Sequence, residues 1–263
     1  MGEYVTFEME GAVGVVTLND PPINLFGAEL MEDLRASVDA LRASPARAAV
    51  IKAAGPNYSG GANVNIFKGN DAAFAREMFS TYLPVIHKIE TAPFPVIAAV
   101  QGLCLAAGLE LALSCDMIFA AQGARFSQVE ALIGATTFLG GAQRLALRCG
   151  DARAREIVYT ADIYDAATFE RWGVVNRVVP DEILVEETLA FAAALAEGPT
   201  RAHAVTKKMV RALVQHGLEA ADEVVLSDSV HLFDTEDMQA GVARILKEGA
   251  KKARYGKKYF KGA

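Results

Sequence analysis

The order of apolar segments along the chain predicts an α/β fold built on a largely parallel sheet and followed by a helical C-terminal region. As far as Val179, short β-rich runs alternate with longer runs of helical periodicity, which is typical of parallel strands joined by helices. After Pro180 the pattern is helical throughout. The chain has 263 residues, 52% of them hydrophobic, so it can bury a sizeable core. We therefore predict an α/β core at 1–197 and a helical region at 198–263.

The N-terminal quarter predicts a hairpin, a helix and a buried strand. Two β-rich runs flank a short turn, and a Pro-Pro pair ends the second run because proline cannot donate to a sheet ladder. The next segment repeats leucines at helical spacing on one face. These elements are strands at 4–9 and 13–18, a helix at 27–43 and a strand at 48–53.

Residues 55–63 form a loop that is too rich in glycine for regular structure. One interpretation is an ordinary surface turn. The other is that backbone N–H groups are exposed here for a ligand, since glycine permits close approach to the backbone. The loop alone does not decide between the two.

The longest apolar stretch, residues 94–121, is long enough to cross a bilayer as a helix. Gln101, Glu110 and Asp116 lie inside it, however, and a carboxylate within a membrane is energetically costly. Its glycines divide it into segments short enough to be elements of a soluble core. We therefore expect no membrane span, but a helix at 71–90, a strand at 94–100, a helix at 106–114 and a strand at 116–121.

The rest of the chain predicts a few more core elements and then only helices. Pro199 suits a first helical turn, and Thr235 is a suitable N-cap for the last helix. The predicted elements are strands at 125–128 and 174–179 and helices at 140–148, 151–159, 182–197, 199–214, 218–233 and 235–247.

Composition excludes several functional classes. Lys and Arg number 26 and Asp and Glu 32, and the net charge of −6 argues against a general nucleic-acid binder. The three cysteines form no CxxC pair, which favours free thiols in a reducing compartment. The first residues lack the basic and apolar regions of a signal peptide, so we expect a cytoplasmic protein.

Common cofactor and nucleophile motifs are missing from the sequence. It has no P-loop, no GxGxxG after a strand and no GxSxG elbow. The four histidines are not spaced as a metal pair, so we expect no metal site. Carboxylates and backbone amides remain as the candidate chemical groups.

Glu110 lies in the middle of the most apolar segment. A carboxyl group there is costly unless it is neutral or well paired. It either meets an arginine or backbone amides in a structural role, or its pKa is raised by desolvation and it transfers protons near neutral pH. Glu130 fits a solvated helix start equally well. Spacing alone does not show that the two meet in space.

Six segments spread over roughly residues 5–245 carry a specific resemblance. They are SGGAN (59–63), PVIAAVQG (95–102), GLELALSCD (108–116), ARFSQVE (124–130), GGAQRL (140–145) and WGVVNRVVP (172–180). In this order they resemble the crotonase superfamily of enoyl-CoA hydratases and isomerases. The resemblance implies an α/β spiral of ββα units with a C-terminal helical trimerisation region, and a homotrimer or a homohexamer. It also implies an acyl-CoA thioester as ligand, with coenzyme A part of the substrate and no separate cofactor.

The resemblance further implies how the site works. The backbone N–H groups of Ala62 and Ala107 match an oxyanion hole for the thioester oxygen. Glu110 and Glu130 match the two acids of the hydratases, and we assign Glu110 mainly to the attacking water and Glu130 mainly to the α-carbon proton. Because both acids are present, enoyl-CoA hydration is the expected reaction. The alternatives are isomerisation, thioester hydrolysis, decarboxylation, or a non-catalytic acyl-CoA-binding protein.

Several positions depart from the family pattern. Ala106 and Ala107 replace the usual glycines of the central turn, so we expect ordinary φ angles there. Phe138 replaces a glycine and is expected to shorten the acyl pocket or displace the catalytic water. Asn63 replaces the common aspartate, and Lys68 is a substitute for the usual coenzyme A-contacting lysine. Further candidate substrate-binding residues are Gly61, Gly108, Lys257 and Phe260.

Overall fold

The structure, a computed structural model, describes residues 2–249 and 260–262. Its main sheet has six strands in the order β1-β2-β3-β4-β6-β9. The first two strands pair antiparallel as the predicted hairpin, and every later pairing in this sheet is parallel. The strands are β1 (Val5–Glu10), β2 (Val13–Leu18), β3 (Ala48–Ala53), β4 (Val96–Val100), β6 (Met117–Ala121) and β9 (Arg177–Val179).

A smaller sheet has the order β5-β7-β8, with β5 (Leu103–Leu105), β7 (Arg125–Ser127) and β8 (Tyr164–Asp165). Only β7 was expected from the sequence. The chain leaves β4 for β5 through Gly102, whose φ is +55°. A side chain at Gly102 would meet the Pro56 carbonyl oxygen at 2.1 Å, so only glycine fits this sharp turn between the two sheets.

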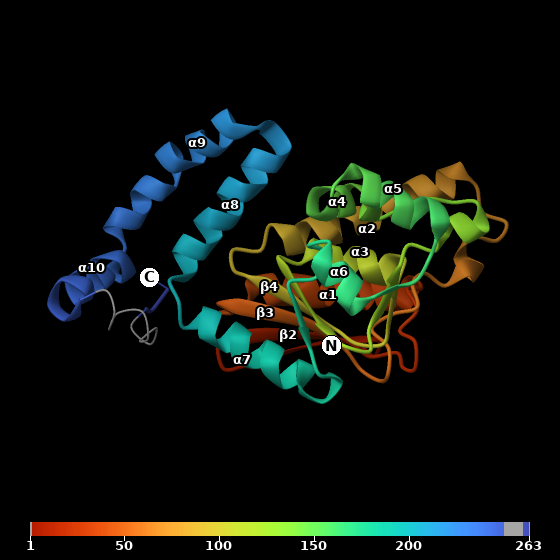
Figure 1. Cartoon of the computed structure of the whole chain (residues 1–263), viewed down its shortest axis with the longest axis horizontal. Coiled ribbons are helices and arrows are strands. Elements are labelled where there is room, and N and C mark those ends of the chain that lie inside the picture. Colours follow the sequence, from red (N-terminus) through yellow and green to blue (C-terminus); the bar gives the residue numbers. More distant parts are fainter. Residues whose placement is uncertain (1, 250–259, 263) are drawn as a thin grey trace.

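Helices cover the main sheet on both sides. Helix α7 packs against β2, β3, β4 and β6, and Figure 1 places it on the side of the sheet away from α2, α3 and α4. The predicted helices are present with ends displaced by a few residues, while α6 and the 3₁₀ helix η1 were not expected. The helices of the core are α1 (Ala28–Ala43), α2 (Ala72–Glu90), α3 (Ala107–Ser114), α4 (Gly141–Cys149), α5 (Asp151–Thr160), α6 (Ala166–Arg171) and α7 (Leu184–Ala196), with 3₁₀ helices η1 (Val64–Phe67), η2 (Glu130–Ile133) and η3 (Asp181–Ile183).

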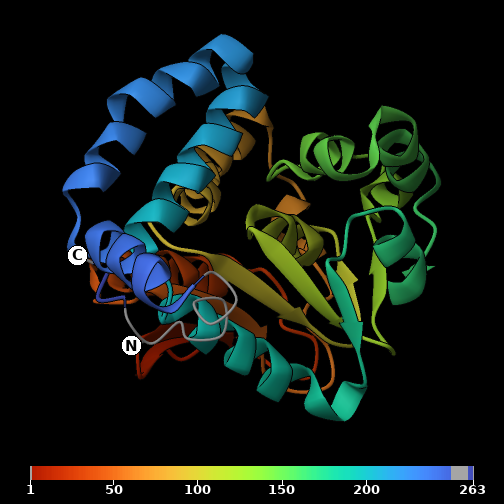
Figure 2. The same cartoon turned by 60° about the vertical axis from the view of Figure 1, so that its left-hand side comes forward.

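The C-terminal helices extend away from this core. Helices α8 (Thr200–His216), α9 (Leu218–Ser227) and α10 (Glu236–Glu248) form an arm beside it in Figures 1 and 2. The single helix expected at 218–233 is two elements, because α9 ends before the 3₁₀ helix η4 (Ser229–Asp234). Thr235 caps α10 as predicted, its side chain accepting from the Met238 N–H at 3.2 Å.

One side chain of the arm reaches back into the core. Lys207 of α8 donates to the Asp116 carboxylate at 2.7 Å and to the Ile89 and Phe94 carbonyl oxygens. This partly buried cation therefore joins α8 to the end of α2 and to the segment after α3. The boundary near residue 198 stays a prediction, although α7 packs on the sheet and α8 departs from it.

The turn into α3 corrects one expectation. Ala106, its N-cap residue, has φ +46° and ψ −122°, where ordinary φ angles were expected. The Ala106 N–H donates to the Ser127 carbonyl at 3.0 Å, and its own carbonyl accepts the Glu110 N–H at 2.9 Å. These two bonds fix the peptide groups on either side, so β7 and α3 together hold a conformation that costs an alanine about 1–3 kcal/mol.

Within the described part of the chain, no helix is both long enough and apolar enough to cross a membrane. The stretch at 94–121 is instead divided among β4, β5, α3 and β6, as expected apart from the additional strand β5.

Candidate active site

A cavity of about 560 Å³ opens beside the first turn of α3. Both candidate carboxylates line it, together with apolar side chains from α1, η1, α2 and η2. A largely apolar cavity with a few convergent polar groups is the usual form of a small-molecule site. The apolar lining includes Phe26, Met31, Phe67, Met78, Phe79, Tyr82, Leu132 and Phe138.

Two backbone N–H groups face this cavity without a partner. Ala62 and Ala107 both line it, and among the described residues neither amide has a protein acceptor. Ala107 is the first residue of α3, where helical N–H groups lack intrahelical acceptors and the helix dipole favours negative charge. Ser59 holds the loop that carries Ala62: its hydroxyl donates to the Asn24 carbonyl and accepts from the Gly61 N–H. The pair is suited to bind an oxygen that gains negative charge.

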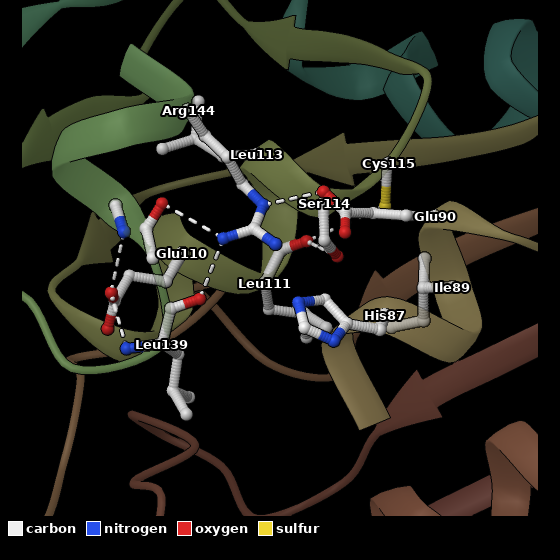
Figure 3. A network of polar contacts seen from close by, with 12 residues as sticks. His87, Ile89, Glu90, Glu110, Leu111, Leu113, Ser114, Cys115, Leu139 and Arg144 are labelled. Atoms are coloured by element: carbon white, nitrogen blue, oxygen red, sulfur yellow. Dashed lines mark hydrogen bonds and ion pairs between the residues drawn. The ribbon is translucent and has the colours of Figure 1, made fainter. Parts of the chain in front are cut away.

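Glu110 projects from α3 into the cavity and is 2% exposed. Its Oε1 accepts the Leu139 N–H at 2.7 Å and the Gly141 N–H at 2.8 Å (Figure 3). Desolvation raises the pKa of this carboxyl above its usual value, while the backbone hydrogen bonds and the nearby Arg144 charge oppose the rise. The carboxylate is thus fixed in place and supplied with donors that favour its ionised form.

Glu130 begins η2 and is 7% exposed. Burial and the Glu110 charge raise its pKa to about 7. The fully buried Gln128 lies against it, and with its NH₂ turned toward Glu130 the amide nitrogen is 2.8 and 3.0 Å from the two carboxylate oxygens. A side-chain amide offers a donor to the ionised carboxylate and an acceptor to the protonated one. Glu130 is therefore suited to exchange a proton near neutral pH.

Two of the predicted substrate-binding residues, Gly61 and Gly108, do not line the cavity but pack behind its wall. A side chain at Gly61 would meet Ala106 Cβ at 2.8 Å, and one at Gly108 would meet Ser59 Cβ at 2.5 Å. Both glycines therefore allow the 59–63 loop to pack closely against the start of α3. This close approach places the Ala62 and Ala107 amides at the same cavity.

The remaining candidate substrate-binding residues lie away from this cavity or outside the described residues. Asn63 caps η1 by accepting the Asn65 N–H, and Lys68 is exposed just after η1. Phe260 lines a different cavity with Arg47, whose guanidinium donates to the Phe260 carbonyl at 3.1 Å. Lys257 lies outside the described residues. Contacts of Lys68, Lys257 and Phe260 with coenzyme A remain predictions.

Phe138 lies in the cavity wall directly before the residues that hold Glu110. Its ring stacks on Phe79 of α2 with centroids 4.8 Å apart and meets Phe67 of η1 edge-on at 5.7 Å. The ring therefore closes the space between α2 and η1 with an apolar surface. Sequence reasoning singled out Phe138 but missed its two aromatic partners, because no motif links them.

Sequence reasoning also missed the ion pair behind Glu110. Arg144 and Glu90 pair at 2.7 Å, and Arg144 is 8% exposed (Figure 3). Arg144 belongs to the GGAQRL segment, which was the available signal, whereas Glu90 at the end of α2 carried none. Among the described residues there is no group of three or more His, Cys, Asp or Glu that could hold a metal ion.

The raised pKa of Glu130 predicts a pH-dependent loss of stability. Between pH 4.5 and about 7 the unfolded state ionises this carboxyl while the folded state keeps it protonated, so the free energy of unfolding falls as pH rises. Glu130→Gln removes this pH dependence. As pH rises between these values, the free energy of unfolding of the variant should therefore increase relative to that of the wild type, by up to about 3 kcal/mol. Urea unfolding at pH 4.5, 6 and 8 measures the difference. A constant difference between variant and wild type would contradict the raised pKa.

Comparison with known proteins agrees with this fold. Residues 8–254 match the family model described as enoyl-CoA hydratase/isomerase. A probable enoyl-CoA hydratase of Rhizobium meliloti is 34% identical over 92% of this chain and 94% of its own, and a crotonyl-CoA hydratase of Syntrophomonas wolfei is 30% identical over 94% and 96%. A crystal structure titled as an enoyl-CoA hydratase subunit from Geobacillus kaustophilus has a TM-score of 0.88 at 32% identity, covering 94% of this chain and 96% of its own. The expected crotonase-type α/β fold with C-terminal helices is confirmed, and the chain belongs to the enoyl-CoA hydratase/isomerase family.

Proposed function

We propose that this protein is an enoyl-CoA hydratase that adds water across the 2-trans double bond of an enoyl-CoA thioester. The observation that carries this proposal is the meeting of two buried carboxylates and two unpartnered backbone N–H groups in one apolar cavity. Family membership supports an acyl-CoA thioester as substrate. The relatives named above, a probable enoyl-CoA hydratase and a crotonyl-CoA hydratase, support hydration among the reactions of the family.

In this proposal the Ala62 and Ala107 N–H groups hold the thioester oxygen. Conjugate addition of water moves electrons from the double bond onto that oxygen, which becomes an enolate. Donors fixed before the reaction stabilise this charge without reorganising, and the loss of one such donor typically costs about 3 kcal/mol. The α3 dipole acts in the same direction at Ala107.

The two carboxyl groups take different roles because their surroundings differ. Glu110 accepts two backbone N–H donors that favour its ionised form, so it takes a proton from water as the water oxygen bonds to the β carbon. Glu130, with a pKa raised to about 7, holds a proton that it delivers to the α carbon as the enolate collapses. One proton is taken up and one released, so exchange of protons with solvent restores both groups.

We also propose that the reaction needs no metal or redox cofactor and that the protein works in the cytoplasm. Addition of water is redox-neutral, and the oxyanion is stabilised by backbone donors. The three free cysteines, two of them buried, suit a reducing compartment. Full activity after dialysis against EDTA, and recovery of activity in the cytosolic fraction of cells, are the expected results.

Incubation with a 2-trans-enoyl-CoA followed by mass spectrometry tests the reaction. The expected result is a product heavier by one water. A product of unchanged mass with a moved double bond would instead indicate an isomerase. Release of free coenzyme A would indicate a thioesterase, and loss of carbon dioxide from a carboxylated acyl-CoA would indicate a decarboxylase. Binding without turnover would indicate a non-catalytic protein.

Substitution of either acid tests the assigned roles. Glu110→Gln and Glu130→Gln each keep the size of the side chain but remove proton transfer, so kcat should fall by ~10²–10⁴-fold with little change in coenzyme A binding. Glu186→Gln, on the exposed side of α7, is the matched control and should retain wild-type turnover. Wild-type hydration rates in both acid variants would refute the mechanism.

Phe138 is proposed to limit the length of the acyl chain. Phe138→Ala removes a ring of the cavity wall that stacks on Phe79, so kcat/KM for an eight-carbon enoyl-CoA should rise relative to the four-carbon substrate by on the order of tenfold. Phe191→Ala is the control, because Phe191 packs on Phe119 at 5.0 Å away from the cavity. An unchanged ratio in Phe138→Ala would mean that this ring does not set the chain length.

A homotrimer or homohexamer is proposed from the exposed apolar side chains of the C-terminal arm. A soluble protein rarely exposes so many apolar side chains unless another surface covers them. Sedimentation velocity should give three or six times the mass of one chain, and Leu226→Arg together with Leu246→Arg should lower it. A single-chain mass for the wild type would contradict the proposal. The exposed residues are Val210, Leu213, Val214, Leu218, Val225, Leu226, Val230, Phe233, Val242, Ile245 and Leu246.

A further inference from the structure

One peptide group joins Glu110 to the ion pair behind it. The Gly141 N–H donates to Glu110 Oε1 at 2.8 Å, and the Gly140 carbonyl of the same peptide group accepts from Arg144 Nη1 at 3.0 Å (Figure 3). Nη1 also binds the Leu139 carbonyl at 2.9 Å. A guanidinium on the carbonyl side polarises the peptide and strengthens the N–H as a donor to the carboxylate. The arginine thus acts on Glu110 without touching it.

The arginine is itself held by α2. Its Nε donates to Glu90 Oε1 at 2.7 Å, at the C-terminal end of the helix whose earlier turns line the cavity. The Arg144 side chain is 9% exposed and that of Glu90 25% exposed, so both charges interact in a poorly solvated setting. Glu90 therefore neutralises part of the positive charge that would otherwise act on Glu110.

The glycine at 140 is required by this arrangement. Its φ is +99°, and a side chain there would meet Arg144 Nη1 at 1.7 Å. The guanidinium occupies the space that a side chain at Gly140 would need. The loop conformation and the arginine position therefore depend on each other.

We propose that Arg144 and Glu90 are a positioning pair, which orients the 139–141 loop and sets, through the Gly140–Gly141 peptide group, the charge that Glu110 experiences. This inference rests on the proposed role of Glu110 in hydration. Neither residue touches the substrate. Arg144 favours ionised Glu110, and Glu90 moderates that effect.

The charged and titratable groups that face this arrangement come from three elements. Burial raises the pKa of Glu130 of η2, and the like charge of Glu110 raises it further. Arg144 of α4 lowers the pKa of Glu110, in agreement with the geometry. On α2, Glu90 pairs with Arg144, and the exposed His87 lies one turn earlier in the same view (Figure 3).

Opposite shifts of the pH–rate profile test the pair. Arg144→Met removes the positive charge, so the acid limb of kcat/KM for a short 2-trans-enoyl-CoA should move up by about one pH unit. Glu90→Gln leaves Arg144 unneutralised, so the same limb should move down by a smaller amount. Arg144→Lys keeps the positive charge but not the planar guanidinium, so the acid limb of this variant should lie between those of the wild type and Arg144→Met. In all three variants kcat should change more than KM.

Further variants distinguish a positioning role of the pair from a purely structural role, and failure of this inference from failure of the proposed function. His87→Gln should leave the profile unchanged, and the Arg144→Met/Glu90→Gln double variant, which buries no unpaired charge, should keep the upward shift. The proposed role of the pair would be wrong if these variants had lower activity with an unchanged acid limb. It would also be wrong if Arg144→Met and Glu90→Gln shifted the acid limb in the same direction. If Glu110→Gln retains wild-type hydration, the proposed function fails instead. A ¹³C titration of the Glu110 carboxyl by NMR measures the same shifts without turnover.

Discussion

The hydrogen bonds from the Leu139 and Gly141 amides to Glu110 are the interaction on which the site depends. They make a carboxylate tolerable at a position that is 2% exposed in the most apolar segment of the chain. Without them, burial would raise the pKa of this carboxyl further and favour its neutral form. The loop that supplies them is held in turn by Arg144, and Arg144 by Glu90 at the end of α2. The position of this carboxylate therefore depends on contacts among α2, α3 and α4.

Helix α3 brings the two chemical functions of the site together. Its first residue offers an N–H with no acceptor among the described residues, and its fourth carries the carboxylate, so one short helix positions both the proposed oxyanion donor and the proposed base. The cost is the positive φ of Ala106, which β7 holds through the Ser127 carbonyl. Strain of this kind persists where the surrounding structure determines the backbone on both sides. The smaller sheet thus supports the site as well as the fold.

The aromatic cavity wall and the C-terminal arm are the features from which chain-length preference and assembly are proposed. The aromatic rings of Phe67, Phe79 and Phe138 come from three separate elements and close one side of the cavity. The Phe138 ring belongs to this wall, and its backbone leads directly into the residues that hold Glu110. The arm contacts the core through the partly buried Lys207–Asp116 pair, near the end of α3.

Sequence periodicity alone determined most of the strands and helices of the core, because strands and amphipathic helices leave local patterns of burial. It missed β5 and β8, which are short and are decided by the turn at Gly102 and by pairing with β7. It also missed the six-residue helix α6. The segment SGGAN, Glu110 and Glu130 were identifiable as candidates, since glycine-rich loops and carboxyl groups in apolar surroundings stand out locally. Only the tertiary structure decided that they share one cavity, that amides from the loop before α4 hold Glu110, and that Arg144 and Glu90 lie behind it. Those contacts join residues distant in the chain, and no local pattern encodes which distant residues meet.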